Sequence, residues 1–236
     1  MKKIISLILI LLMLALSLAS CQAQNTSLTS DGTKDTDSAA TEKPTWAPHD
    51  APTLADIDLS TLESLDGVSE SATQTDYVMI KVKDYGDIVI RLFPDVAPLT
   101  VQNFKKLVSE KFYDGLIFHR VIKTFVIQGG DPLGTGYGGS SANVRGEFSE
   151  NGFENNLPHK KGVISMARGS NTDSASSQFY ICHKTRSDLD GKYATFGYTV
   201  YGIDVVDAIA TTKTNANDKP ISDVVIESVK FVTVSK

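Results

Sequence analysis

Residues 118–131 of this 236-residue chain read FHRVIKTFVIQGGD. Two short apolar runs, 116–122 and 125–128, lie in and beside this stretch and are bounded by Gly and Asp. Apolar runs of this length between turn-forming residues are typical of β-strands. We therefore predict two short strands around the Gln-Gly-Gly-Asp sequence.

Further apolar runs on the C-terminal side repeat this pattern. They lie at 162–166, 178–182 and 194–200, and each is bounded by Gly, Asp or Asn. A Val-rich segment, 221–234, closes the chain. We predict a strand at each of these four places.

A β-hairpin is predicted on the N-terminal side. Residues 77–83 alternate between apolar and polar side chains, as a strand with one buried face does. The turn sequence DYGD follows at 84–87, and a second apolar run occupies 88–93. These three segments together indicate two antiparallel strands joined by a tight turn.

Two segments, 101–108 and 203–210, have apolar residues at helical spacing. Many strands and two helices, without regular alternation of strand and helix, favour a closed antiparallel barrel or a sandwich. The same order disfavours a doubly wound sheet. We assign one mainly β domain to 76–236.

Other chemical motifs give little support to cofactor or hydrolase chemistry. Residues 134–139, GTGYGG, have the glycine spacing of a dinucleotide-binding loop. Such a site requires a following helix, and residues 140–152 lack helical periodicity. We predict a shaped loop there. The four histidines form no closely spaced metal-binding pair with Cys, Asp or Glu, and no Gly-x-Ser-x-Gly elbow occurs. We expect neither a metal nor a cofactor.

The stretch 118–136 resembles the signature of cyclophilin-type peptidyl-prolyl isomerases. Three further blocks are similar to family blocks and follow in family order: GVISMA at 162–167, SQFYI at 177–181 and LDGKYATFG at 189–197. The resemblance extends over about residues 76–236. It implies a closed eight-stranded antiparallel β-barrel capped by two α-helices, and peptidyl-prolyl cis-trans isomerase activity.

The resemblance also implies the active-site residues. Proline isomerisation needs no nucleophile, because an enzyme has only to favour the twisted amide over both planar forms. Arg120 matches the family arginine, whose guanidinium would donate hydrogen bonds near the prolyl nitrogen. Phe125 and Gln128 complete the implied catalytic set. The implied substrate-binding residues are Val126, Ala167, Arg168, Gln178, Tyr180, Leu189 and Tyr193.

The chain departs from the best-known family pattern at the edge of this site. Asp188 stands where cyclosporin-sensitive members have Trp, so we expect weak binding of that drug. Tyr180 replaces Phe, Tyr193 replaces His and Arg168 replaces Asn. None of these changes affects the implied catalytic set, so activity is expected to persist.

The first 21 residues are predicted to be a bacterial lipoprotein signal peptide. Lys2 and Lys3 precede a mostly apolar run at 4–18, which is shorter than the about 20 residues that a membrane span needs. Residues 18–21, LASC, resemble a lipobox, in which the cysteine is lipidated after cleavage. We therefore predict an extracytoplasmic protein anchored to a bacterial membrane through Cys21.

Residues 22–75 are predicted to be an acidic flexible tether. This segment contains ten acidic residues, two lysines and few apolar residues, too little apolar surface to offset chain entropy. The chain's net charge of −5 therefore originates in the tether, and the domain that follows is close to neutral. We find no basic cluster suited to nucleic acid. The expected partners are proline-containing client polypeptides, with the domain acting as a monomer.

Composition excludes some classes and leaves others open. With 41% hydrophobic and 22% charged residues, the chain is neither collagen-like, nor a coiled coil, nor wholly disordered, and two cysteines exclude a disulfide scaffold. A non-catalytic proline-peptide binding module or holdase on the same barrel remains an alternative; it would show peptide affinity without rate enhancement. A solute-binding lipoprotein is disfavoured, because the sequence blocks leave no room for a two-lobed cleft.

Overall fold

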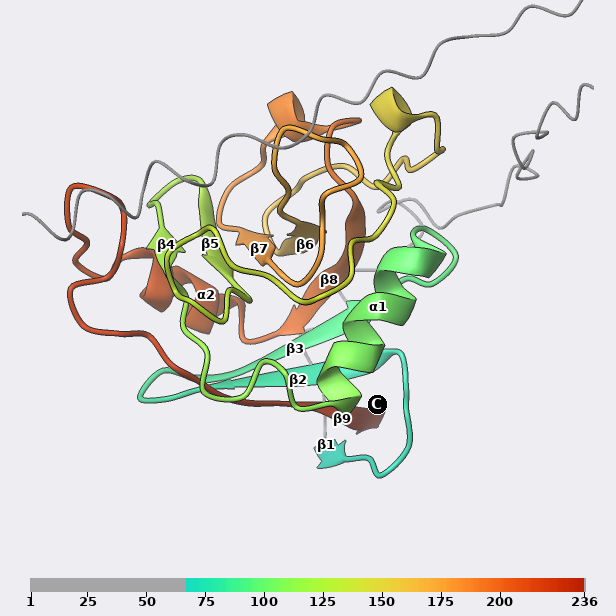
Figure 1. Ribbon diagram of the computed structural model, residues 1–236. Helices are drawn as coiled ribbons and strands as arrows, with labels where there is room; N and C mark the ends of the chain where they lie inside the picture. The colour runs from blue at the N-terminus through green and yellow to red at the C-terminus, as the bar shows by residue number, and fades with distance from the viewer. Residues whose placement is uncertain (1–66, 236) are drawn as a thin grey trace, which may run out of the picture. The chain divides into compact units, whose positions relative to one another are not determined.

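The structure, a computed structural model, describes residues 67–235 (Figure 1). The predicted signal peptide, its Cys21 and residues 22–66 of the predicted tether lie outside the described residues. The strands are β1 (Gly67–Glu70), β2 (Tyr77–Val82), β3 (Gly86–Leu92), β4 (Arg120–Val121), β5 (Val126–Gly129), β6 (Val163–Met166), β7 (Phe179–Cys182), β8 (Thr195–Tyr201) and β9 (Ile226–Ser235). The helices are α1 (Pro98–Ser109), α2 (Ile203–Ala210) and the short 3-10 helices η2 (Ser149–Asn151) and η3 (Ser187–Leu189).

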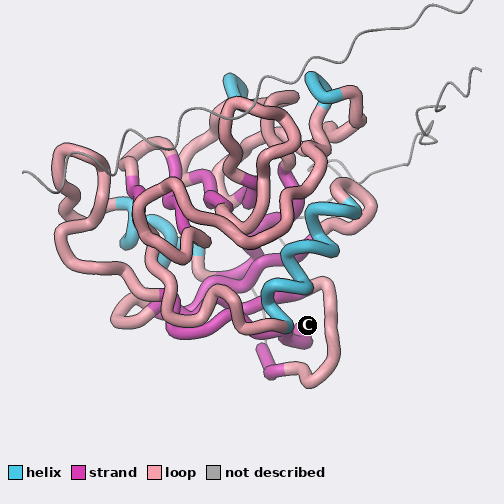
Figure 2. The backbone as a smooth tube through the Cα atoms, viewed as in Figure 1, coloured by secondary structure: helices cyan, strands magenta, loops and turns pink. Residues whose placement is uncertain are grey.

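The strands form one sheet in the order β1-β9-β2-β3-β8-β6-β7-β5-β4, and every neighbouring pair is antiparallel. Figure 2 shows these strands running through the described part of the chain, with long loops between them. The predicted hairpin is present as β2 and β3, and the predicted helices are present as α1 and α2. The mainly β class with two α-helices is confirmed.

The prediction of a closed eight-stranded barrel is wrong in two respects. Within residues 67–235 the sheet has nine strands, and its two end strands, β1 and β4, do not pair with each other. Residues just before β4 approach the start of β9 through a single isolated bridge between Ile117 and Val225. Because β4 is only two residues long, this side has no continuous ladder to close the sheet.

The additional strand is β1, at Gly67–Glu70. It pairs with the C-terminal half of β9, from Gly67 opposite Ser235 to Glu70 opposite Val232. This strand lies inside the range 22–75 that the composition assigns to the tether. The folded part of the chain therefore extends on the N-terminal side at least to Gly67.

The inward face of the sheet and the apolar face of α1 enclose the main core. Phe104 of α1 is fully buried, and its ring centroid lies 5.1 Å from Tyr113, 5.2 Å from Phe196 and 5.8 Å from Phe179. Tilted and edge-to-face aromatic pairs at these distances are favourable. The cluster packs α1 against Phe179 of β7 and Phe196 of β8. Helix α2 packs against β3 and β5.

The N-terminus of α1 is capped by a residue far away in the sequence. Ala97, the N-cap residue, makes no side-chain hydrogen bond. Instead the carboxylate of Glu147 accepts hydrogen bonds from the backbone N–H groups of Leu99 and Thr100 at 3.0 and 2.8 Å. Glu147 is completely buried, and its negative charge also complements the positive end of the helix dipole.

The glycine-rich segment 134–139 is a shaped loop, as predicted, and no helix follows it before η2. The buried carboxylate of Asp131 accepts hydrogen bonds from the backbone N–H groups of Leu133, Thr135 and Gly136 at 2.8, 2.9 and 2.6 Å. Burial acts to raise the pKa of Asp131, but these donors outweigh it and lower the pKa. The Asp131 carboxylate thus fixes the first half of the loop through three backbone N–H groups.

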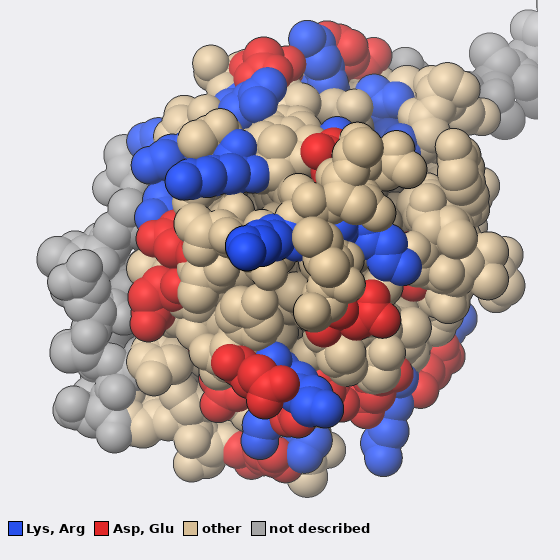
Figure 3. All heavy atoms as spheres, turned by 90° about the vertical axis from the view of Figure 1, so that its left-hand side faces the viewer, with Lys and Arg blue, Asp and Glu red and all other residues tan. Residues whose placement is uncertain are grey.

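Within the described part of the chain, neither α-helix has the length and apolar character needed to cross a membrane. The face of the domain shown in Figure 3 carries Lys and Arg side chains interspersed with Asp and Glu side chains.

Candidate active site

The candidate site is built on one row of residues across adjacent strands. Arg120 of β4 lies opposite Gln128 of β5, Gln128 lies opposite Tyr180 of β7, and Tyr180 lies opposite Ser165 of β6. Residues in register across a sheet point to the same face. The pairing therefore places on one surface side chains that lie up to 60 residues apart in the sequence.

Alternation along each strand adds the second row. Val126 lies two residues before Gln128 and opposite Cys182, which lies two residues after Tyr180. Val126, Tyr180 and Cys182 form a small apolar cluster separate from the main core. The residues between them, such as Ile127 and Ile181, point into the main core. This strand pair thus has a core face and a site face.

A pocket of about 190 Å³ opens on the site face. A cavity of this size is smaller than the roughly 300–1,000 Å³ of pockets for drug-sized ligands and suits one small ring. Nine of the ten implied catalytic and substrate-binding residues line it, which are Arg120, Phe125, Val126, Gln128, Ala167, Arg168, Tyr180, Leu189 and Tyr193. Strands β5 and β7 supply one side, and η3 with the segment that follows it supplies the other.

Arg120 is held at the edge of this pocket by weak contacts. Its Nη1 donates a hydrogen bond to Gln128 Oε1 at 3.3 Å, and its Nε lies 3.9 Å from the Asp218 carboxylate. The Arg120 side chain is 41% exposed. Since a guanidinium has five N–H donors, most of them remain available to a bound peptide.

Gln178 is the one implied substrate-binding residue that does not line this pocket. Its Oε1 accepts a hydrogen bond from Gln128 Nε2 at 2.9 Å, and its Nε2 donates to the carbonyls of Gly136 and Gly138 at 3.0 and 2.7 Å. Gln178 therefore links the shaped loop to Gln128 and, through it, to Arg120. It lines an adjoining hollow of about 550 Å³, together with Gln128, Ala167 and Arg168.

Phe125 forms the outer wall between two cations. The guanidinium carbon of Arg186 lies 4.1 Å from the ring centroid of Phe125, and that of Arg120 lies 5.7 Å from it. Both distances fall within the range of cation–π attraction. The preceding Thr124 has a positive φ of 68°, and its N–H donates to His183 Nδ1 at 2.9 Å, which holds the turn that presents the ring.

Arg168 and Tyr193 form the rim on the other side. The Arg168 guanidinium carbon lies 4.8 Å from the Tyr193 ring centroid, and the Tyr193 ring packs edge-on against Tyr180. Arg168 Nε and Nη2 both donate to the Lys192 carbonyl, at 3.1 and 2.9 Å. The replacement of Asn by Arg therefore braces the segment that carries Tyr193.

Cys182 lies beneath the pocket floor and is fully buried. Burial raises the pKa of its thiol to about 12, so the thiolate that reacts with electrophiles is scarce at neutral pH. In a full-length Cys21→Ser variant we expect no measurable reaction with Ellman's reagent at pH 8 in native buffer. One thiol per chain should react in guanidinium chloride. Reaction in native buffer at the rate of a free thiol would contradict this burial.

The chemical character of the site is that of a binding slot with two guanidinium groups at its edge. Among residues 67–235, no group of three or more His, Cys, Asp or Glu side chains is placed to hold a metal ion. The groups facing the pocket are apolar or aromatic walls, an amide and two guanidinium groups. Such a set can bind a small ring and donate hydrogen bonds to it.

Comparison with known proteins assigns the family. The sequence model described as "Cyclophilin type peptidyl-prolyl cis-trans isomerase/CLD" matches residues 77–231, which include every strand of the site. The chain belongs to this cyclophilin family. It is a peptidyl-prolyl cis-trans isomerase, as the sequence blocks predict.

Individual cyclophilins agree with this assignment. The peptidyl-prolyl cis-trans isomerase ppi1 of Schizosaccharomyces pombe is 46% identical over 138 residues, which cover 58% of this chain and 86% of that protein. The isomerase CYP71 of Arabidopsis thaliana is 44% identical over 146 residues, 61% of this chain but only 22% of that longer protein. The crystal structure of a Cryptosporidium parvum cyclophilin with the dipeptide Ala-Pro has a TM-score of 0.61 and 32% identity, covering 66% of this chain and 98% of that one.

Sequence reasoning did not identify several residues that shape the cyclophilin pocket. His159 contacts the Tyr180 hydroxyl, and Arg186 lies over the Phe125 ring. Asp190 contacts His159, and His183 accepts a hydrogen bond from the N–H of Thr124, next to Phe125. No spacing or motif relates His159 to the wall that it contacts, because Tyr180 lies 21 residues away. Only the folded chain brings them together.

Proposed function

We propose that this isomerase accelerates rotation of X–Pro bonds in extracytoplasmic client proteins and so assists their folding. The observation that supports this function best is the convergence of nine implied site residues on one pocket with Arg120 at its edge. Uncatalysed X–Pro rotation takes tens to hundreds of seconds, slow enough to limit folding. A client that folds outside the cytoplasm would benefit from an isomerase held at the same place.

The proposed mechanism depends on a hydrogen bond that strengthens only as the amide twists. In the planar amide, resonance delocalises the nitrogen lone pair, so the prolyl nitrogen is a poor acceptor. Rotation breaks the resonance and localises the lone pair on a pyramidal nitrogen. A donor from Arg120 then binds the transition state more strongly than either planar form, which is the requirement for catalysis.

The pocket walls and Gln128 have a different part in this proposal. Phe125, Val126, Tyr180 and Leu189 would hold the proline ring while the residue before it rotates. Gln128 bonds to both Arg120 and Gln178, so it would orient the guanidinium and donate to the substrate backbone. These contacts act in the planar and the twisted states alike and serve mainly for binding.

The direct test is an isomerase assay on the purified chain. Exchange NMR on an X–Pro peptide should show rate enhancement that scales with enzyme concentration and requires Arg120. Peptide binding without rate enhancement would replace the proposal with a non-catalytic binding module. The same assay would test the expected weak inhibition by cyclosporin. Asp188 lies on η3 and pairs with Arg186 at 2.7 Å, so it offers a charge where Trp stands in sensitive members.

We also propose that the enzyme is a monomer anchored to a bacterial membrane by lipid on Cys21, with residues 22–66 as the spacer. The support is the short apolar segment at 4–18, the LASC sequence and the acidic composition of the spacer. Labelled fatty acid fed to the producing bacterium should be incorporated into the wild-type chain and lost in Cys21→Ser. A Cys182→Ser chain is the matched control and should stay labelled. Incorporation that persists in Cys21→Ser would contradict the anchor.

A further inference from the structure

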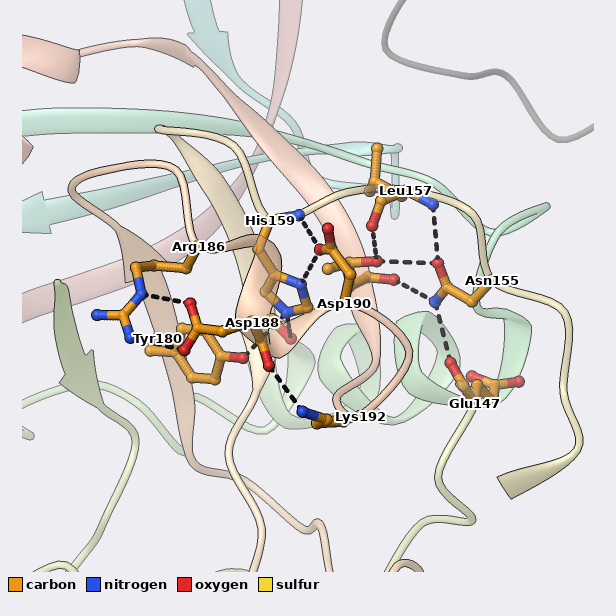
Figure 4. Close-up of polar contacts among 11 residues, drawn as sticks. Glu147, Asn155, Leu157, His159, Tyr180, Arg186, Asp188, Asp190 and Lys192 are labelled. Atoms are coloured by element: carbon orange, nitrogen blue, oxygen red, sulfur yellow. Dashed lines mark hydrogen bonds and ion pairs between the residues drawn. The ribbon is translucent and has the colours of Figure 1, made fainter. Parts of the chain in front are cut away.

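A chain of hydrogen bonds runs behind the pocket from a surface loop to the pocket wall (Figure 4). Asp190 Oδ1 lies 2.8 Å from His159 Nδ1, and His159 Nε2 lies 3.0 Å from the hydroxyl of Tyr180. The His159 side chain is 1% exposed, whereas that of Asp190 is 38% exposed. Tyr180 is itself a wall of the pocket. These hydrogen bonds therefore connect the solvent-exposed Asp190 to the pocket wall through one buried imidazole.

His159 also holds the loop that forms the opposite wall. Its backbone N–H donates to the same Asp190 Oδ1 at 2.7 Å, and its carbonyl accepts the N–H of Arg186 at 2.7 Å. The segment 186–190 between these two contacts carries Leu189, which lines the pocket. One residue thus contacts both the β7 wall and the loop wall.

The contacts define the tautomer of His159. Burial lowers the pKa of His159, so its imidazole is neutral at pH 7. Since Nδ1 faces a carboxylate, which only accepts, Nδ1 must carry the proton. Nε2 is then an acceptor, and the Tyr180 hydroxyl donates to it. Ser165 Oγ, 3.2 Å from Nε2, lies on the same side. The Tyr180 proton consequently points away from the pocket, and its ring faces the slot.

The outer side of the loop is braced by a separate set of contacts. Arg186 Nε and Nη2 donate to the two carboxylate oxygens of Asp188 at 2.7 Å each, and Lys192 Nζ donates to the Asp188 carbonyl at 3.0 Å (Figure 4). These groups are exposed or partly exposed, and solvent weakens such pairs. These contacts join residues of the loop to one another, whereas the contact of Asp190 with the buried His159 side chain connects the loop to Tyr180 on β7.

We propose that His159 and Asp190 are positioning residues that set the width of the proline slot. They hold Leu189 on the loop at a fixed distance from Tyr180 on β7, and they act on substrate only through these two walls. The inference rests on the proposed use of this pocket for the proline ring. Because the walls contact the ring in planar and twisted states alike, loosening them weakens binding and leaves the rotation step unchanged.

The test compares kcat, KM and the dissociation constant of an X–Pro peptide in the intact chain with three variants. For Asp190→Ala we expect KM and the dissociation constant to rise about tenfold, with kcat within twofold of wild type. Asp190→Asn keeps an oxygen that accepts from both N–H groups of His159, so its KM should stay within about threefold. Glu150 lies on η2, and its backbone N–H donates to the Gly191 carbonyl beside this loop. Glu150→Ala removes one negative charge near the loop and leaves the contacts of His159 intact, so this variant should match wild type.

Several results would overturn the proposal. The first is a KM within twofold of wild type in Asp190→Ala. The second is a loss of kcat at unchanged KM in the same variant. The third is an Asp190→Asn enzyme that is as impaired as Asp190→Ala. Failure of the proposed mechanism would instead appear as full kcat in Arg120→Ala, so the two failures are distinguishable.

A measurement on the wild-type chain keeps the test independent of variant folding. Nitrogen-15 NMR of the imidazole distinguishes protonated from unprotonated ring nitrogens. We expect His159 at pH 7 to have a protonated Nδ1 and an unprotonated Nε2. The opposite tautomer would break the link from Asp190 to Tyr180 and overturn the inference whatever the variants do.

Discussion

Replacing Arg120 with Ala is expected to lower kcat about 100-fold while KM changes by threefold or less. Removal of one preorganised donor that acts on the transition state typically costs about 10²–10³ in rate, and 100-fold corresponds to about 2.7 kcal/mol. Arg120 contributes little to folding, because its contacts are a 3.3 Å hydrogen bond and a 3.9 Å ion pair at 41% exposure. Exchange NMR on an X–Pro peptide measures both constants.

Two control variants make this result specific. Arg120→Lys keeps the charge but loses the planar fork of donors, so we expect an intermediate loss of kcat. Arg91→Ala removes an arginine of β3 that stacks on Phe93 outside the pocket, and it should leave the kinetics unchanged. Full activity in Arg120→Ala would show that another group stabilises the twisted amide.

Replacing Phe104 with Ala should cause the largest loss of stability, about 4 kcal/mol in the free energy of unfolding. The ring is fully buried among Tyr113, Phe179 and Phe196, so its removal leaves a cavity that these fixed neighbours cannot fill. For a domain of this size the midpoint of thermal unfolding should fall by roughly 10 °C. Urea unfolding followed by circular dichroism measures the free energy.

Leu99→Ala is the matched control on the same helix. Leu99 is 38% exposed, so the change should cost less than about 1 kcal/mol. A Phe104→Ala protein that loses no more than this control would mean that the aromatic cluster does not hold α1 to the sheet. Phe179 belongs to the same cluster and lies next to Tyr180 on β7, so partial loss of activity should accompany the loss of stability.

Much of the fold was predictable because it follows from short-range patterns of apolar and turn-forming residues. The hairpin of β2 and β3 follows from alternation and a turn sequence, and α1 and α2 follow from helical spacing. The start of α1 was predicted less well. Its cap, Glu147, lies 47 residues from Thr100, and no local pattern connects the two.

The sheet closure was predicted wrongly, and the first strand was not predicted, for a related reason. The family resemblance implied closure, but β4 is two residues long, and its neighbourhood meets β9 only through the bridge from Ile117 to Val225. Strand β1 lies in a segment whose composition indicates a tether. It forms a strand because the edge of β9 would otherwise be unpaired. The composition of a segment does not indicate whether such an edge is available to it.

The sequence by itself determined the family, the strand alternation and which neighbours share a face, such as Val126 with Gln128 and Tyr180 with Cys182. These properties depend on residues close together in the chain, where period and motif are visible. The tertiary structure alone decided that Gln128 lies opposite Tyr180, that Gln178 holds Gln128, and that His159 joins the two pocket walls. Those contacts exist because burial of the common core determines which distant strands and loops become neighbours. The spacing of the residues in the sequence does not indicate which of these contacts will form.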